Sequence, residues 1–180
     1  MKKEVIAIIV VIIFIISGFL IFNDKGNSGG IIVVDRLELT SDAFENNALI
    51  PSKYTCDGED INPSLKIGEV PFRAKSLVLI IDDPDAPDGT WTHWVVININ
   101  PKIKEIKENS IPGIELTNSF QRTSYGGPCP QSGKHRYLFK VFALDTKLEA
   151  DSNADKKAVE NAMQGHVLAQ SEIIGLYERS

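Results

Sequence analysis

The sequence lacks the motifs of several common protein classes. It contains no HExxH motif and no paired CxxC motifs, which are typical ligand spacings of zinc sites. It has no long basic cluster, which argues against a protein built chiefly around nucleic-acid phosphates. It has no internal repeat, and no low-complexity segment beyond the glycine-rich residues 23–30, which excludes a solenoid or repeat array.

Length and charge indicate one globular unit. A chain of 180 residues is long enough for one domain with its own core and too short for two of ordinary size. The 19 basic residues are outnumbered by 24 acidic ones, which gives a formal net charge of -5. A site for one small anion would therefore have to be a local pocket.

The longest apolar run lies at the N-terminus. Residues 5–22 carry no charge and are mostly isoleucine and valine, and as a helix they would span about 27 Å, close to the ~30 Å bilayer core. Two lysines precede the run, so the positive-inside rule places residues 1–4 in the cytoplasm and the domain outside. We expect a retained transmembrane anchor. The alternative is a cleaved signal peptide and a secreted domain, but the run is long for that purpose and no A-x-A-like site follows.

The polar residues 23–30, NDKGNSGG, predict a short flexible linker, so the domain is expected over residues 31–180. The sequence has two cysteines, Cys56 and Cys129. An even count in a compartment that permits oxidation allows one disulfide. Two separate buried thiols are the alternative, and the sequence does not decide between them because it does not give their distance.

Hydrophobic patterning predicts a mainly β fold. Alternating or continuous apolar runs predict strands at residues 31–39, 76–82, 93–98, 136–144 and 173–177. One helix is predicted near residues 154–170, with Ser152 and Asp155 as a capping box. Because no crossover helices alternate with the strands, we expect antiparallel sheets packed face to face, with the helix at the periphery.

Residues 82–94, DDPDAPDGTWTHW, follow one of the predicted strands and combine four carboxylates with a histidine and two tryptophans. The alternation of Leu79 and Ile81 continues to Asp83, so this carboxylate is expected at the exit of the strand on its buried face. Pro84 holds Asp83 in an extended conformation. The segment therefore places a carboxylate at the edge of the core.

Two histidines begin two other predicted strands. The alternation places His93 on the same face as Val95 and Ile97, and it places His135 on the same face as Tyr137. If the strands converge, the two histidines, Tyr137 and the strand-end carboxylate line the mouth of one apolar cavity. A few convergent polar groups in an apolar cavity are typical of a small-ligand site.

A second loop, residues 125–137 with the sequence YGGPCPQSGKHRY, contains glycines at which backbone N–H groups can approach a ligand. Such donors together with two imidazoles suit an oxygen of phosphate, sulfate or carboxylate. Asp83 would then either orient a histidine or meet the ammonium group of a zwitterion. A ligand pocket is our interpretation of both loops.

Several of these residues also have purely structural interpretations. Asp82, Asp85 and Asp88 are compatible with turn formation and capping of N–H groups. His166 lies on the apolar stripe of the predicted helix and is interpreted as structural. The two tryptophans, Trp91 and Trp94, are expected to be packing residues, with contact to a ligand at the pocket rim as the alternative.

Catalytic alternatives can also be written for these residues. His93, His135 and Asp83 with one water would match the ligand set of a catalytic zinc ion, although they come from separate strands. Cys129 or Ser124 could pair with His135 as a nucleophile, but no nucleophile-elbow motif frames either residue. The sequence favours neither alternative over a binding pocket.

Four segments resemble the phosphatidylethanolamine-binding protein family, in particular its bacterial and archaeal branch related to Raf kinase inhibitor protein. They are DDPDAPDGTWTHW at residues 82–94, GGPCPQSGKHRYLFKVFALD at 126–145, YTCDGEDINPSL at 54–65 and MQGHVLAQSEIIGLYER at 163–179. Together the resemblance extends over essentially all of residues 31–180. The ordered combination of DPDAP, a histidine followed by an aromatic residue, and GxHRY is more specific than any single motif.

The resemblance implies an antiparallel β-sandwich with peripheral helices and a small anion pocket at one end. The family's pocket residues correspond here to Asp83, Asp85, His93, Gly127, Pro128, His135 and Tyr137. The family binds phosphate-bearing head groups, nucleotides or carboxylates, has no established catalytic reaction, and implies no cofactor or metal. Its eukaryotic members act through protein partners such as kinases.

The combined expectation is a membrane-anchored, extracytoplasmic binding protein with a pocket for phosphate, phosphoethanolamine or a carboxylate. Animal members of the family are soluble and cytosolic, so their kinase-regulating role is not expected to carry over. The alternatives are a protein-interaction module that inhibits a protease or kinase, and a metal- or cysteine-dependent hydrolase.

Overall fold

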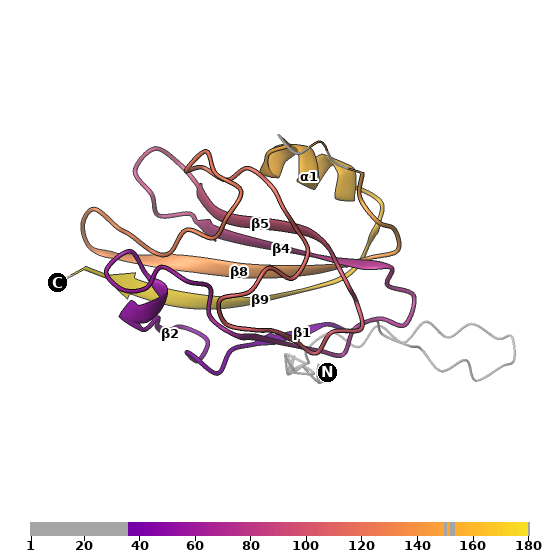
Figure 1. The fold of residues 1–180 in the computed structure, drawn as a ribbon, viewed down its shortest axis with the longest axis horizontal. Helices are drawn as coiled ribbons and strands as arrows, with labels where there is room; N and C mark the ends of the chain where they lie inside the picture. Colours follow the sequence, from indigo (N-terminus) through magenta and orange to yellow (C-terminus); the bar gives the residue numbers. More distant parts are fainter. Residues whose placement is uncertain (1–35, 150, 152–153, 180) are drawn as a thin grey trace, which may run out of the picture. The chain divides into compact units, whose positions relative to one another are not determined.

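A computed structural model describes residues 36–149, 151 and 154–179 (Figure 1). The elements in this part of the chain are β1 (Glu38–Thr40), β2 (Ala48–Leu49), the 3₁₀ turn η1 (Ser52–Tyr54), β3 (Leu65–Gly68), β4 (Ser76–Asp83), β5 (Trp91–Ile99), β6 (Glu105–Ile106), β7 (Ile114–Glu115), β8 (Lys134–Leu144), α1 (Lys156–Met163) and β9 (Val167–Glu178). The predicted anchor at 5–22 and linker at 23–30 lie outside the described residues. None of the helices in the described part is long and apolar enough to span a bilayer.

The strands form two sheets, which confirms the mainly β prediction. The smaller sheet has the order β1-β3-β6, and the larger one has the order β2-β9-β8-β4-β5-β7. All pairs are antiparallel except β2 with β9, which is parallel, so the prediction of purely antiparallel sheets was wrong at this edge. The described residues contain one peripheral α-helix rather than several.

Strand β4 is buried on both faces because each face packs against a different layer. Leu79 and Ile81 belong to the core that contains residues of the smaller sheet, whereas Val78 and Ile80 pack in a second cluster with Val159 of α1. Figure 1 shows α1 on one side of the large sheet and β1 on the other. Burial on both faces explains why this strand reads as a nearly continuous apolar run.

The helix is shorter than the predicted 154–170. Asp155 is its N-cap, and its side chain accepts a hydrogen bond from a backbone N–H of the first turn. The chain leaves the helix after Met163 and passes through Gly165 at φ +78°, a conformation that favours glycine. Residues 167–170 then pair with β8, so the strand predicted at 173–177 is the C-terminal part of a much longer one.

The other predicted strands overlap observed ones. Strands β4, β5 and β8 contain the whole of the predicted segments 76–82, 93–98 and 136–144. The segment 31–39 overlaps β1 only at its end, and residues 31–35 lie outside the described part.

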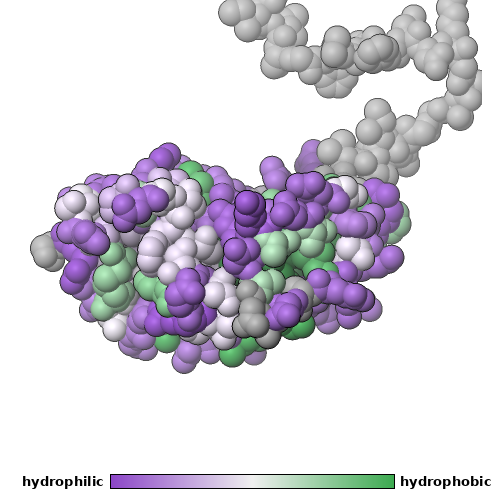
Figure 2. Space-filling model, turned by 90° about the horizontal axis from the view of Figure 1, so that it is seen from above, coloured by the Kyte–Doolittle hydropathy of each residue, from purple (hydrophilic) through white to green (hydrophobic). Residues whose placement is uncertain are grey.

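The loops that hold the predicted site residues gather at one end of the large sheet. Figure 1 shows the β4–β5 loop, the loop before β8 and the C-terminal end of β9 on the same side of the molecule. The view from above in Figure 2 shows a largely hydrophilic surface with smaller hydrophobic patches between the polar residues. Most of the large apolar side chains are therefore used in the two cores.

Candidate functional site

A cavity of about 360 Å³ opens among these loops. Its walls come from the end of β4, the β4–β5 loop, the start of β5, the loop before β8 and the last described residue. They comprise Asp83, Ala86, Pro87, Asp88, Trp91, His93, Phe120, Cys129, Pro130, Gln131, His135 and Arg179. Of the seven predicted ligand-binding residues, the structure brings Asp83, His93 and His135 together at this cavity.

Asp83 and His135 form a partly buried pair because β4 and β8 run antiparallel, with the end of β4 beside the start of β8. His135 Nδ1 donates to Asp83 Oδ2 at 2.7 Å, and the other oxygen of Asp83 accepts the N–H of Asp85 at 2.8 Å. The carboxylate fixes the orientation of the ring and leaves Nε2 for other partners. This nitrogen accepts a hydrogen bond in the neutral ring and donates one in the protonated ring.

His93 reaches the cavity by a route that the strand alternation did not predict. Val95 and Ile97 face the α1 side of the sheet, whereas the His93 ring contacts Tyr137 in the opposite core. The register shifts between Ile81↔Trp94 and Asp82↔Thr92, so His93 is an extra residue on β5. This β-bulge reverses the direction of its side chain. The prediction that His93 shares a face with Val95 and Ile97 was therefore wrong.

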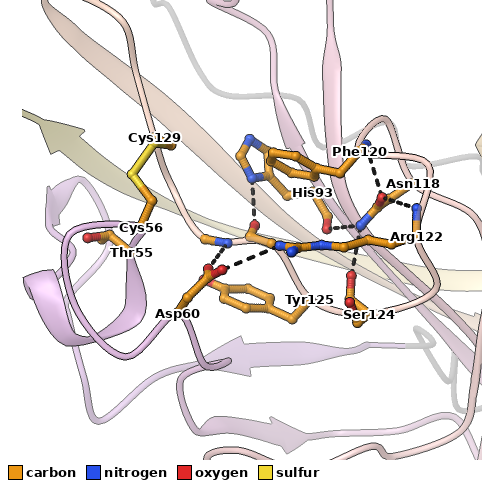
Figure 3. A network of polar contacts seen from close by, with 12 residues as sticks. Thr55, Cys56, Asp60, His93, Asn118, Phe120, Arg122, Ser124, Tyr125 and Cys129 are labelled. Atoms are coloured by element: carbon orange, nitrogen blue, oxygen red, sulfur yellow. Dashed lines mark hydrogen bonds and ion pairs between the residues drawn. A yellow bond between two sulfur atoms is a disulfide. The ribbon is translucent and has the colours of Figure 1, made fainter.

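The His93 ring is buried and held on several sides. Its Nδ1 lies 2.6 Å from the carbonyl oxygen of Gly126, a bond visible in Figure 3. The rings of Tyr137 and Phe120 contact it edge to face, with centroid distances of 5.2 and 5.3 Å. Burial lowers the pKa of His93 below its ordinary value. This effect is larger than the opposing effects of the Gly126 hydrogen bond and the charge of Asp83, which both raise the pKa. His93 is therefore neutral at pH 7.

Tyr137 lies beneath the cavity rather than in its wall, and its side chain is fully buried. Its hydroxyl oxygen faces the Asp83 carboxylate and the Cys129 backbone, but the geometry completes no hydrogen bond with either. Among the described residues it is the one buried side-chain polar atom without a partner. Burial and the nearby charge of Asp83 raise the pKa of Tyr137 well above its ordinary value, so it is neutral at all physiological pH values.

Asp85 lies outside the cavity lining and binds Arg136. Its carboxylate accepts hydrogen bonds from the Arg136 backbone N–H at 2.9 Å and from the guanidinium at 2.7 and 2.9 Å. These bonds lower the pKa of Asp85 to about 2. Asp85 thus links the β4–β5 loop to the start of β8 through its bonds to Arg136, next to the cavity but outside its lining.

Gly127 and Pro128 also lie outside the lining. The Gly127 N–H donates to Asp60 Oδ1 at 2.6 Å, and the Gly126 N–H donates to the His93 carbonyl oxygen at 3.2 Å. Both glycine N–H groups are thus bonded within the protein, which differs from the expectation that they face a ligand. The carbonyl oxygen of Pro128 accepts the N–H of Cys56 at 3.1 Å.

Cys56 and Cys129 form a disulfide, with a Cα–Cα distance of 5.5 Å across a sequence separation of 73 residues. This settles the alternatives left open by the sequence. The bond joins the segment after η1 to the loop before β8, and Cys129 itself lines the cavity. It also leaves no free thiol for a Cys129 nucleophile. In the described part of the chain, no group of three or more His, Cys, Asp and Glu side chains is arranged to hold a metal ion.

The predicted ligand-binding set did not include Trp91, Phe120 and Arg179, which also line the cavity. Trp91 is directly opposite Asp83 in the β4–β5 pairing and contacts Phe120 edge to face at 5.3 Å. Arg179 follows the core-facing residue Tyr177 by two positions, so the alternation along the strand places it on the same face, at the edge of the cavity. Its guanidinium binds Asp57 at 2.9 Å. The alternation of β9 could have placed Arg179, whereas no local signal places Phe120, which reaches the cavity from an irregular loop.

Comparison with known proteins agrees with the fold and the motifs. The model of the family described as phosphatidylethanolamine-binding protein matches residues 40–178. The UPF0098 protein of Methanothermobacter thermautotrophicus is 47% identical over 150 residues, which cover 79% of this chain and 99% of the relative. That of Aquifex aeolicus is 47% identical over 171 residues, which cover 90% of this chain and 98% of the relative.

Two solved structures share the fold. A phosphatidylethanolamine-binding protein homologue from Chlamydia trachomatis has a TM-score of 0.79 at 40% identity, over 81% of this chain and 99% of that one. YbcL of Escherichia coli, described as a member of the mammalian family, has a TM-score of 0.75 at 29% identity, over 80% and 99%. This chain therefore belongs to the phosphatidylethanolamine-binding protein family, in its prokaryotic UPF0098 branch.

Proposed function

We propose that the chain is a binding protein whose cavity takes a small anionic or zwitterionic group such as phosphate, phosphoethanolamine or a carboxylate. The observation that carries the proposal is the convergence of His93 and His135, from two strands, on one cavity of about 360 Å³. Such a volume is at the lower end of the usual range of small-ligand pockets, about 300–1,000 Å³. It suits a head group rather than a whole lipid.

The groups around the cavity suit both parts of a zwitterion. When protonated, His135 donates from Nε2 to a ligand oxygen while Asp83 stabilises its charge through Nδ1. The Arg179 guanidinium, which is paired with Asp57, also lines the cavity. Asp88 and Trp91 also belong to the lining, and a carboxylate and an aromatic face suit an ammonium group.

The proposal includes an extracytoplasmic location with residues 5–22 as the membrane anchor. The apolar run supports the anchor, and the disulfide supports an oxidising compartment. We propose binding rather than catalysis, because the cavity contains no nucleophile paired with either histidine: Cys129 is bonded to Cys56.

The test is calorimetric titration of residues 31–180 with phosphate, phosphoethanolamine and acetate. This part corresponds to almost the entire chain of the C. trachomatis homologue, which has the same fold. The wild type is expected to bind at least one of the three, and His135→Ala is expected to weaken binding at least tenfold. Absence of binding by all three ligands would refute the proposal.

His166→Ala is a matched control. His166 Nδ1 also binds a carboxylate, Asp145, at 2.8 Å, but on the exposed surface. This variant is expected to bind like the wild type. An equal loss in both histidine variants would show that the effect of His135 is not specific to the cavity.

A second candidate is a docking module for a protein such as a protease or kinase. The observation that favours it is the pair of half-exposed aromatic rings at the cavity mouth, Trp91 and Phe120. Aromatic side chains are enriched among residues that dominate protein interfaces. A partner that is captured equally by wild type and His135→Ala, and lost with Trp91→Ala, would favour docking over ligand binding.

A further inference from the structure

A single peptide unit, which joins Gly126 to Gly127, links His93 to Asp60 (Figure 3). Its carbonyl oxygen, on Gly126, lies 2.6 Å from His93 Nδ1, and its N–H, on Gly127, donates to Asp60 Oδ1 at 2.6 Å. His93 lines the ligand cavity, whereas Asp60 lines a separate hollow that also includes Arg122. The peptide thus separates the two side chains and is bonded to both of them.

The peptide fits between its neighbours because both of its residues are glycines. A Cβ on Gly127 would lie 2.5 Å from the Tyr54 carbonyl oxygen and 2.7 Å from Asp60 Oδ1. A Cβ on Gly126 would lie 2.6 Å from the Phe120 ring. Real side chains do not approach so closely, so any other residue would push the peptide away from Asp60 or from the loop around Phe120.

The geometry fixes which nitrogen of His93 carries the proton. A carbonyl oxygen can only accept a hydrogen bond, so Nδ1 is the protonated nitrogen of the neutral ring and Nε2 is an acceptor. The charge of Asp60 polarises the peptide, which makes the Gly126 oxygen a stronger acceptor for the His93 proton. Asp60 also anchors the peptide in place, so its effect on His93 is both electrostatic and positional.

We propose that Asp60 is a positioning residue that acts through the Gly126–Gly127 peptide to hold His93 with Nε2 as a hydrogen-bond acceptor. This inference rests on the proposed function of the cavity. A ligand oxygen that meets His93 Nε2 has to carry a proton, so among the anions proposed above the cavity favours those with an O–H group over ionised carboxylates. Hydrogen phosphate has such a group at neutral pH, whereas sulfate has none.

The position of the proton is measured first, without ligand. In residues 31–180 at pH 7.5, the ¹⁵N chemical shifts of the His93 ring report which nitrogen is protonated. The wild type is expected to have Nδ1 protonated. Asp60→Ala is expected to give a mixture of the two tautomers, because the carbonyl loses its anchor. Asp60→Asn is expected to restore the wild-type state, since the amide oxygen can still accept the Gly127 N–H.

Arg122→Ala is the matched control for the charge of Asp60. The Arg122 guanidinium lies 3.4 Å from Asp60 Oδ2 on the exposed side of the loop, and its removal leaves the bond from Gly127 intact. This variant is expected to keep the wild-type tautomer. If it changes the tautomer as much as Asp60→Ala does, the ion pair and not the peptide controls His93, and the proposal fails.

Ligand selection is measured second, by calorimetric titration with sodium phosphate and sodium sulfate at pH 7.5. The wild type is expected to bind phosphate at least tenfold more tightly than sulfate, because an unprotonated Nε2 facing a sulfate oxygen leaves two acceptors unpaired. Asp60→Ala is expected to reduce this ratio below about threefold, since the other tautomer donates from Nε2. Asp60→Asn and Arg122→Ala are expected to keep the ratio.

The outcomes separate the two proposals. If the wild type binds neither anion, the proposed function fails, while the tautomer measurement still tests the role of Asp60 by itself. A wild-type His93 protonated on Nε2, an unchanged tautomer in Asp60→Ala, or equal affinity for the two anions would overturn the inference. The wild-type measurements need no variant, so they remain decisive if Asp60→Ala does not fold.

Discussion

Asp82 and Asp83 are adjacent on β4 and nearly equally buried, yet they belong to different regions of the molecule. Asp82 faces the α1 side, where it accepts hydrogen bonds from the Thr92 hydroxyl at 3.0 Å and the Lys156 ammonium at 2.8 Å, with Lys140 at 3.3 Å. Asp83 faces the cavity and holds His135, whose second nitrogen remains available. The comparison teaches that burial alone does not distinguish a structural carboxylate from one in a candidate site.

What distinguishes them is the nature of their partners. The partners of Asp82 are two lysines and a hydroxyl that cross-link β4, β5, β8 and α1. The partner of Asp83 is an imidazole that can change its protonation state and presents a second polar atom to an open space. We therefore expect changes on the Asp82 side to affect stability, and changes on the Asp83 side to affect binding.

The largest expected effect concerns the disulfide, which lies on the cavity side of the comparison because Cys129 lines the cavity. Replacing both cysteines, as Cys56→Ser with Cys129→Ser, removes a cross-link that closes 73 residues. The loop-entropy relation predicts a loss of about 4 kcal/mol in the free energy of unfolding. Urea denaturation measures the loss, and phosphate affinity is expected to fall with it. A loss below about 1 kcal/mol would mean that the two loops hold their places without the bond.

Asp82→Asn tests the structural side of the comparison. It removes the negative charge that lies between Lys140 and Lys156. The side chains of these lysines are each about a quarter exposed and can turn to water. The expected loss in the free energy of unfolding is therefore about 2–3 kcal/mol, which is less than for a fully buried ion pair. Phosphate affinity is expected to stay within twofold of the wild type. Denaturation and calorimetry on the same samples provide both quantities.

Asp83→Asn is the reciprocal variant. The amide keeps the shape of the side chain but no longer supports a protonated His135, so phosphate affinity is expected to fall at least tenfold while stability falls by about 1 kcal/mol. If Asp82→Asn weakens phosphate binding as much as Asp83→Asn does, the assignment of Asp82 to stability and of Asp83 to binding is wrong.

The next effect is a pH dependence that arises from His93. Its pKa in the folded protein is lowered by burial, so the unfolded chain binds a proton there more readily. Stability contributed by the neutral ring is therefore complete above the unfolded pKa of about 6.5 and is lost as pH falls below that value. Denaturation between pH 8 and 5 should show a smaller decline in His93→Gln than in the wild type.

The smallest expected effect is that of Asp85→Asn, at the rim of the cavity region. The folded-state pKa of Asp85 is lowered to about 2, so its stabilisation is present above the ordinary carboxylate value and is lost as pH falls toward 2. Because Arg136 is half exposed, the pair is worth about 1 kcal/mol or less at pH 7. Acid titration of unfolding should show a weaker decline below pH 4 in the variant than in the wild type.

Parts of the site could be predicted because they follow from local periodicity. Asp83 and His135 continue the alternation of apolar residues on their strands, and the structure places both at the cavity. The same rule failed for His93 because a β-bulge depends on how β5 pairs with β4, which a pattern within one strand does not contain. The predicted helix failed at its C-terminal end for a similar reason, since residues 167–170 pair with β8.

The sequence by itself determined the family, the mainly β architecture, the buried strand β4 and the positions of the carboxylate and the second histidine at strand ends. These features depend on side-chain order along short segments. Only the tertiary structure decided the disulfide, the face of His93 and the link from Asp60 through the Gly126–Gly127 peptide. Each of these joins segments far apart in the chain, and hydrogen-bond geometry between such segments is set by packing of the whole domain rather than by local periodicity.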